Sequence, residues 1–154
     1  MPCLAYFLTW TTYGTWLHGD QRGSVVDQNN SSFKIVEHTP RHQRTATRLE
    51  EPAFLLDSSS RALVEDTIHR VAQHRNWTIH ALNARSNHVH VVVSSSTHRP
   101  EIVAGQFKSW ATRDLHDAGA IDNRKRIWTA KASTRWLNDE KSLHAAIDYV
   151  KNHQ

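Results

Sequence analysis

Strand-like and helix-like apolar spacings alternate along this chain in an order that few folds accommodate. Residues 3–11 are apolar on both alternating faces, as expected of a central strand. Residues 58–75 instead place Val64, Ile68 and Ala72 at helical spacing, after a run of serines that could cap the helix. Further segments continue this alternation: we expect strands at 77–83, 88–93 and 127–137, and helices at 100–118 and after Asn138 or Asp139.

The predicted order is strand, helix, strand, strand, helix, strand, with one further helix at the end. This is the order of a ferredoxin-like split βαβ layer, an α+β fold with an antiparallel sheet. Residues 77–83 and 88–93 should form a hairpin that turns around residues 84–87, and residues 127–137 should form the fourth strand, in which a bulge or a break is possible. Two helices should cover one face of the sheet and leave the other face open for a partner. Many unrelated functions use this fold, so the fold alone assigns none.

The length of 154 residues and the hydrophobic content of 38% predict a single domain over residues 1–154. Residues 12–52 interrupt the pattern with glycines and a polar run, and we expect a loop-rich insertion with short strands only at 24–26 and 33–36. No apolar run approaches the roughly 20 residues of a membrane span, and a signal peptide is not recognisable. We therefore expect no membrane association and a cytoplasmic protein that joins the nucleoid when it binds DNA.

The net charge and the cysteine content limit which partners and which metal ligands the chain can have. The formal net charge of +4, with 12 further histidines, favours an anionic partner without proving one. Cys3 is the only cysteine, which excludes an intramolecular disulfide and a cysteine-based zinc site, so a metal would need histidine, carboxylate or amide ligands. The chain contains six tryptophans, and we expect most of them in the core, although exposed indoles can also stack on unpaired bases.

Two histidines lie two residues apart in the segment 88–93. If this segment is a strand, His88 and His90 share one face and can converge on a divalent ion, while Val89, Val91 and Val93 face the other way. With 12 histidines in the chain, however, about one such pair is expected by chance. The spacing alone leaves open both a metal site and an incidental pair.

The last predicted helix places a tyrosine and a histidine on the flank of its apolar stripe. Tyr149 and His153 are four residues apart and therefore share a neighbourhood on the helix. Spacing alone is also consistent with Tyr149 as a core-edge aromatic and His153 as a solvated terminal residue. The apolar stripe that should hold the helix on the sheet consists of Leu143, Ala146, Ile147 and Val150.

In combination, three segments resemble the single-tyrosine HUH transposases, a family of transposases of the smallest insertion sequences and of tyrosine transposases associated with repeated extragenic palindromes (REP). The segments are residues 87–90, 107–112 and 146–150, and residues 7–12 agree as well. The resemblance covers most of the chain outside residues 13–52.

The resemblance implies that His88 and His90 bind Mg²⁺ or Mn²⁺ together with a third ligand, His153. It implies that Tyr149 attacks single-stranded DNA with hairpin ends, and that the resulting 5′-phosphotyrosine and free 3′-hydroxyl are later rejoined to another end. Three imidazole ligands would favour Mn²⁺ over the harder Mg²⁺. Relatives act as homodimers or as monomers, and the sequence leaves both states open.

Basic residues supply the candidate DNA contacts. Arg124, Lys125 and Arg126 adjoin Trp128, so phosphate contacts with neighbouring base stacking are as reasonable as a solvated turn. Lys108 and Arg113, which fall outside the apolar stripe of the second helix, have the same two interpretations.

Two other functions remain open at this point. One is a non-catalytic or domesticated DNA-binding module on the same fold, in which the histidines are incidental. The other is a histidine-based metal hydrolase in which water is the nucleophile in place of Tyr149.

Overall fold

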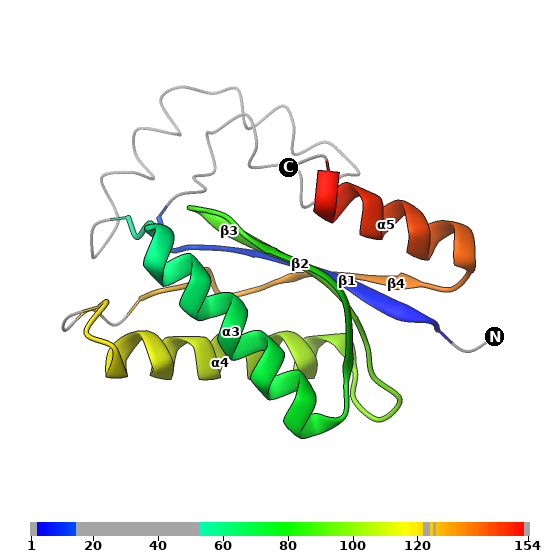
Figure 1. Cartoon of the computed structure of the whole chain (residues 1–154), viewed down its shortest axis with the longest axis horizontal. Helices are drawn as coiled ribbons and strands as arrows, with labels where there is room; N and C mark the ends of the chain where they lie inside the picture. Colours follow the sequence, from blue (N-terminus) through cyan, green and yellow to red (C-terminus); the bar gives the residue numbers. More distant parts are fainter. Residues whose placement is uncertain (1–2, 15–52, 122–123, 125, 153–154) are drawn as a thin grey trace.

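The computed structural model describes residues 3–14, 53–121, 124 and 126–152 of the chain. The strands and helices follow one another in the predicted order (Figure 1). The short strands expected at 24–26 and 33–36, and the site candidates Lys125 and His153, lie outside the described residues. In chain order the elements are β1 (Ala5–Thr11), α3 (Ser58–Arg75), β2 (Thr78–Ala84), β3 (His88–Ser94), α4 (Pro100–Asp117), β4 (Ser133–Leu137) and α5 (Glu140–Asn152).

The described strands form an antiparallel sheet in the order β2-β3-β1-β4. This order follows from the predicted hairpin of β2 and β3 and from the central position of β1, which is apolar on both faces. The ferredoxin-like α+β fold is therefore confirmed. Helices α3 and α4 pack side by side against one face of the sheet, and α5 lies on the opposite face (Figure 1).

Side chains of the central strands point alternately into two separate hydrophobic cores, one on each face of the sheet. On the side of α3 and α4, Leu8, Val91 and Phe107 are fully buried in the larger core. On the other side, a smaller core forms where α5 covers the sheet with the predicted stripe. The expectation of an open second face is therefore wrong in part, because the amphipathic α5 buries its own stripe there. The buried members of the smaller core are Ala5, Ala81, Val92, Leu137, Ala146 and Val150.

The helices begin and end at residues with clear local reasons. Asp57, rather than the serines that follow it, caps α3, because its side chain accepts a hydrogen bond from the Ser60 amide at 2.8 Å. Asp139 caps α5 in the same way through the Ser142 amide at 2.7 Å. After α4, Gly119 adopts a positive φ of 73°, a conformation that glycine adopts without strain, so the predicted end of this helix is confirmed.

The fourth strand is shorter than the predicted 127–137, with a break before Ser133. The preceding residues are held by α4 instead of by a continuous ladder. The Lys108 ammonium donates to the Thr129 carbonyl at 2.8 Å, and the Trp128 indole donates to the Thr112 hydroxyl at 2.9 Å. A single bridge between Thr12 and Trp128 continues the pairing upstream.

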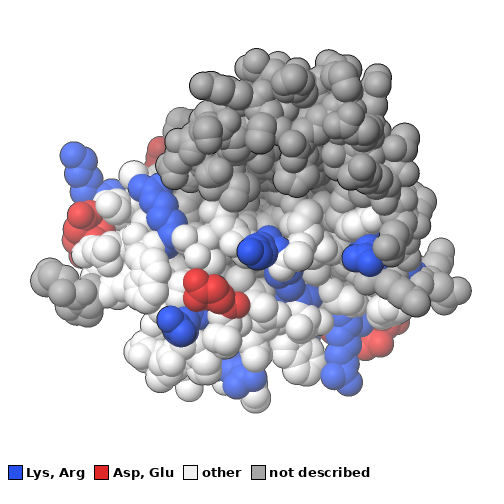
Figure 2. All heavy atoms as spheres, turned by 180° about the vertical axis from the view of Figure 1, so that it is seen from behind, with Lys and Arg blue, Asp and Glu red and all other residues white. Residues whose placement is uncertain are grey.

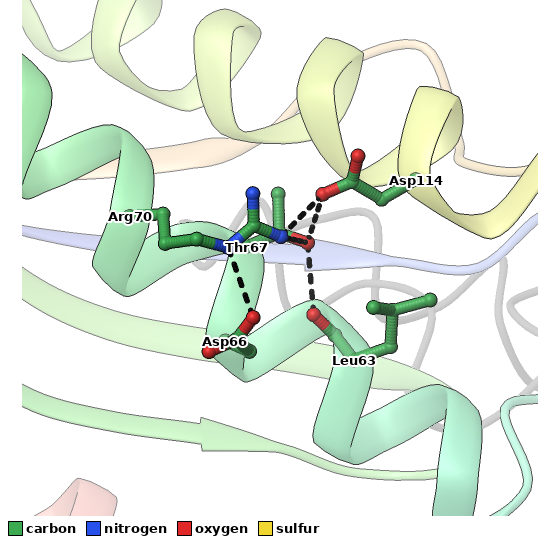
Figure 3. Close-up of polar contacts among 5 residues, drawn as sticks. All are labelled: Leu63, Asp66, Thr67, Arg70 and Asp114. Atoms are coloured by element: carbon green, nitrogen blue, oxygen red, sulfur yellow. Dashed lines mark hydrogen bonds and ion pairs between the residues drawn. The ribbon is translucent and has the colours of Figure 1, made fainter. Parts of the chain in front are cut away.

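A polar network joins α3 to α4 (Figure 3). The hydroxyl of the fully buried Thr67 lies 2.7 Å from an Asp114 carboxylate oxygen and 2.8 Å from the Leu63 carbonyl oxygen. Arg70 donates to the same Asp114 oxygen at 2.6 Å and to Asp66 at 2.9 Å. The two helices of the larger core are therefore joined by polar contacts as well as by apolar ones.

The tryptophans divide between the core and the surface. Trp10 and Trp77 are buried and Trp128 is partly buried, whereas Trp110 and Trp136 are exposed. The prediction that tryptophans lie in the core is thus confirmed for Trp10 and Trp77 and in part for Trp128. In the part of the chain that the structure describes, no helix is both long enough and apolar enough to cross a bilayer.

Candidate active site

His88 and His90 lie on the face of the sheet that α5 covers. They alternate along β3 with valines that point into the larger core, as the period of a strand requires. Their ring centroids are 4.6 Å apart, with an angle of 74° between the ring planes. His90 is only 7% exposed, and His88 is partly buried. The predicted sharing of one face is therefore confirmed.

A hydrogen-bonding neighbour orients each imidazole through its Nδ1 atom. Thr9, which pairs with His90 across β1 and β3, places its hydroxyl 2.8 Å from His90 Nδ1. The Asn87 side-chain oxygen lies 2.7 Å from His88 Nδ1. An amide oxygen only accepts, so His88 Nδ1 carries the proton in this arrangement and the lone pair is on Nε2. In the tautomer in which His90 likewise donates from Nδ1 to the Thr9 hydroxyl, the lone pair of each ring is on Nε2.

The buried ring of His90 is neutral at physiological pH. Burial, together with smaller electrostatic contributions from His88 and Arg85, lowers its pKa to about 3. A neutral imidazole is the form that binds a metal ion, and ligating histidines typically donate their second nitrogen to a polar neighbour. The Nδ1 contacts and the neutral state of His90 therefore fit a divalent cation bound through Nε2.

Tyr149, on α5, lies beside His90. Its ring centroid lies 5.7 Å from that of His90 and 6.0 Å from that of Phe7, while 44% of the residue stays exposed. The fully buried Val150 fixes this part of α5, and its carbonyl oxygen accepts a hydrogen bond from the Asn83 side chain at 3.2 Å. Tyr149 is thus packed beside His90 while part of the residue stays exposed to solvent.

The third metal ligand is not part of this described cluster. Among the residues that the structure describes, no group of three or more histidine, cysteine or acidic side chains could hold a metal ion. His153, the predicted third ligand, lies outside them and stays a prediction. The described site supplies two imidazoles and the phenol.

Sequence reasoning did not assign roles to several residues that shape this site. Thr9 and Phe7 come from β1, Asn83 from β2 and Arg85 from the turn between β2 and β3. The signal that could have found Thr9 is strand pairing, because the alternate residues of the central strand must face the histidines once β1 and β3 are neighbours.

The basic candidates lie elsewhere on the molecule. Lys108 and Arg113 are on α4, on the opposite side of the sheet from the histidines. The ammonium of Lys108 bonds to the Thr129 carbonyl, and burial lowers its pKa. The Arg113 guanidinium lies 5.2 Å from the ring centroid of the exposed Trp110. Their contacts with DNA stay predictions.

Arg124 and Arg126 lie beside the end of β1 rather than on α4. Their guanidinium carbons are 5.9 Å and 5.8 Å from the ring centroid of Tyr13, which follows β1 closely. In Figure 2, which shows the molecule from behind, Lys and Arg side chains are spread over the described surface with acidic residues among them. The described part of this face therefore carries no single basic patch, and DNA contacts of Arg124 and Arg126 stay predictions.

Comparisons with known proteins agree on one class. A family model described as "Transposase IS200 like" matches residues 31–153. A solved structure of a REP-associated tyrosine transposase bound to a REP hairpin has a TM-score of 0.52 and 13% identity, with coverage of 97% of this chain and 66% of that chain. A candidate transposase from Deinococcus radiodurans has a TM-score of 0.51 and 14% identity, with coverage of 100% and 93%. Among curated proteins, none matches significantly.

Proposed function

The chain belongs to the IS200-like transposase family, and we propose that it cleaves and rejoins single-stranded DNA through a covalent bond to Tyr149. The observation that carries this proposal is the position of the Tyr149 ring, which packs against His90 beside His88 and stays 44% exposed. A phenol held next to two oriented imidazoles and open to solvent can meet a phosphodiester. A tyrosine used only for packing has no need of such neighbours.

The proposed step exchanges one phosphodiester for another. The Tyr149 oxygen forms a bond to phosphorus while the bond between phosphorus and the 3′-oxygen breaks. The phenol loses a proton and the departing 3′-oxygen gains one, so no water or nucleotide is consumed. The products are a 5′-phosphotyrosine and a free 3′-hydroxyl. Rejoining is the reverse step, with the 3′-hydroxyl of another DNA end as the attacking group.

His88 and His90 are the residues that would hold a divalent cation, with His153 as the proposed third ligand. When bound, Mg²⁺ or Mn²⁺ supplies Lewis-acid activation of the phosphate. The protein's own part is orientation: Thr9 and Asn87 fix the two imidazoles, and Phe7 and Val150 fix the tyrosine. Because a phenol has an ordinary pKa of about 10, positioning beside an activated phosphate is essential to its reactivity at neutral pH.

Hairpin-ended DNA is the proposed substrate. The fold is shared with a transposase that was solved bound to a REP hairpin, and the net charge of this chain is +4. The chain spans 66% of that relative, so the relative's complete activity is a proposal for this protein and not a transfer.

The test mixes the protein with single-stranded hairpin oligonucleotides copied from the DNA that flanks its gene, in the presence of Mn²⁺. A covalent adduct that survives denaturation is measured on a gel for the wild type, Tyr149→Phe and the His88→Ala/His90→Ala double variant. Tyr6→Phe is the matched control, because Tyr6 is buried on the other side of the sheet and donates to the His98 carbonyl. We expect an adduct with the wild type and Tyr6→Phe and none with the other two proteins.

Two results would redirect the assignment. Salt-sensitive hairpin binding without any adduct would identify a DNA-binding module that does not cleave. Cleaved DNA without a protein adduct would identify water as the nucleophile.

A further inference from the structure

Arg85 lies in the turn between β2 and β3, directly opposite His88. Its backbone amide donates to the His88 carbonyl at 2.7 Å and so extends the β2–β3 ladder by one residue. The preceding pair, Ala84 and Val89, points into the larger core. Since successive side chains alternate between faces, Arg85 is on the face of His88 and His90.

The charge of Arg85 is not neutralised within the described chain. Three other arginines, by contrast, have partners of their own. Arg70 forms ion pairs with Asp66 and Asp114. The Arg75 side chain donates a hydrogen bond to Gln106, and the Arg113 guanidinium lies over the Trp110 ring. Arg85 is partly buried, and its guanidinium has no hydrogen-bond, ion-pair or ring partner among the residues that the structure describes. The influence of its positive charge on His90 is consistent with this placement.

The proposed reaction would be assisted by a positively charged side chain beside the phosphate. A phosphodiester brings a negative charge, and further charge develops on its non-bridging oxygens during the transfer. A guanidinium is permanently charged, and its planar fork matches two oxygens of a phosphate.

We propose that Arg85 is a catalytic residue that binds the phosphodiester attacked by Tyr149 and donates hydrogen bonds to its non-bridging oxygens. This inference rests on the proposed function and adds to it the residue that recognises the reacting phosphate. Arg85 belongs to the β2–β3 turn, so it approaches the phosphate from the strand side, whereas Tyr149 approaches from α5.

The experiment measures the single-turnover rate of adduct formation on the hairpin oligonucleotide with Mn²⁺. The proteins are the wild type, Arg85→Gln and Arg85→Lys, with Arg99→Gln as the matched control. Arg99 is an exposed arginine before α4, and its side chain makes no capping hydrogen bond. We expect Arg85→Gln to slow the reaction about 100-fold. Arg85→Lys should recover part of this loss, because it keeps the charge without the fork. Arg99→Gln should react at the wild-type rate.

A second oligonucleotide separates phosphate binding from a structural role of the turn. It carries a neutral methylphosphonate in place of the cleaved phosphodiester, at the position mapped with the wild type. If Arg85 acts on the phosphate charge, the difference between the wild type and Arg85→Gln should shrink to less than about 3-fold on this substrate. An undiminished difference would mean that the turn is distorted, and would overturn the inference.

The outcomes also distinguish this inference from the proposed function. A wild-type rate for Arg85→Gln would overturn the role of Arg85 and leave the tyrosine mechanism intact. Absence of an adduct with the wild type itself would overturn the tyrosine mechanism, and the role of Arg85 with it.

Discussion

At the scale of single residues, the orientation of the two imidazoles depends on neighbours that carry no charge. Thr9 and Asn87 each place an oxygen within 2.8 Å of an Nδ1 atom. Such contacts keep each ring from rotating and make Nε2 the nitrogen that would bind a metal ion. The reactivity of the site should therefore be sensitive to substitutions that leave the histidines themselves unchanged.

Replacing Thr9 by valine removes the hydroxyl and keeps the shape. We expect the affinity for Mn²⁺ to fall about 10- to 100-fold, because His90 loses the partner of its Nδ1. Titration of Mn²⁺ by electron paramagnetic resonance measures the change. Thr134→Val on β4 is the control, since Thr134 pairs with Leu8 and so shares the other face of the sheet. Equal affinities for wild type and Thr9→Val would contradict the role given to Thr9.

The buried His90 should make the stability of the metal-free protein depend on pH. Burial, with smaller contributions from the neighbouring His88 and Arg85, lowers its pKa from 6.5 to about 3 in the folded chain. Between these values the unfolded chain binds a proton that the folded chain excludes, so the free energy of unfolding falls as the pH decreases from 6.5 toward 3. The slope from this group is at most about 1.4 kcal/mol per pH unit.

Urea denaturation in the presence of a chelator tests this dependence. The wild type should lose stability more steeply with acidification than His90→Gln, which lacks the titrating ring. Parallel curves for the two proteins would show that His90 is not the group responsible.

At the scale of elements, the contact between α3 and α4 combines a buried hydroxyl with a partly exposed ion pair (Figure 3). Thr67 is fully buried, whereas the Arg70 side chain is 54% exposed. Solvent weakens the ion pair to at most about 1 kcal/mol, whereas a buried hydrogen bond to a carboxylate contributes about 1.5–3 kcal/mol. The Thr67–Asp114 bond should therefore dominate the network.

Asp114→Ala is accordingly expected to lower the free energy of unfolding by about 2 kcal/mol, and Arg70→Ala by less than about 1 kcal/mol. Urea denaturation of both variants measures the difference. A larger loss for Arg70→Ala would reverse the ranking of the two interactions.

The order of the elements could be predicted because apolar periodicity is a local property of the sequence. The length of β4 could not, because Lys108 and Trp128 hold the preceding residues through contacts between distant parts of the chain. The stripe of α5 was predictable, but its docking on the second face depends on tertiary contacts such as the Asn83 bond to Val150.

At the scale of the whole molecule, the two faces of the sheet have different roles. One face forms the larger core with α3 and α4, and the other carries the histidines beneath α5. His88, His90 and Tyr149 could be singled out from spacing and from family resemblance. Their neighbours Thr9 and Phe7 required the register of β1 against β3.

Tyr149 lies against His90 of its own chain, which predicts that one copy supplies both parts of the site. A mixture of Tyr149→Phe with the His88→Ala/His90→Ala variant should therefore give no adduct on the gel. Recovery of the adduct in the mixture would mean that the tyrosine of one copy serves the histidines of a partner, as in an exchanged homodimer.

The central claim is that Tyr149 forms the covalent bond to DNA, and mass spectrometry of the digested adduct tests it most directly. The chain has three tyrosines, so the modified peptide identifies the nucleophile. The account predicts a 5′-phosphate-linked nucleotide on Tyr149 and a free 3′-hydroxyl on the released strand. Attachment to Tyr6 or Tyr13, or a 3′-phosphate linkage to the protein, would contradict it.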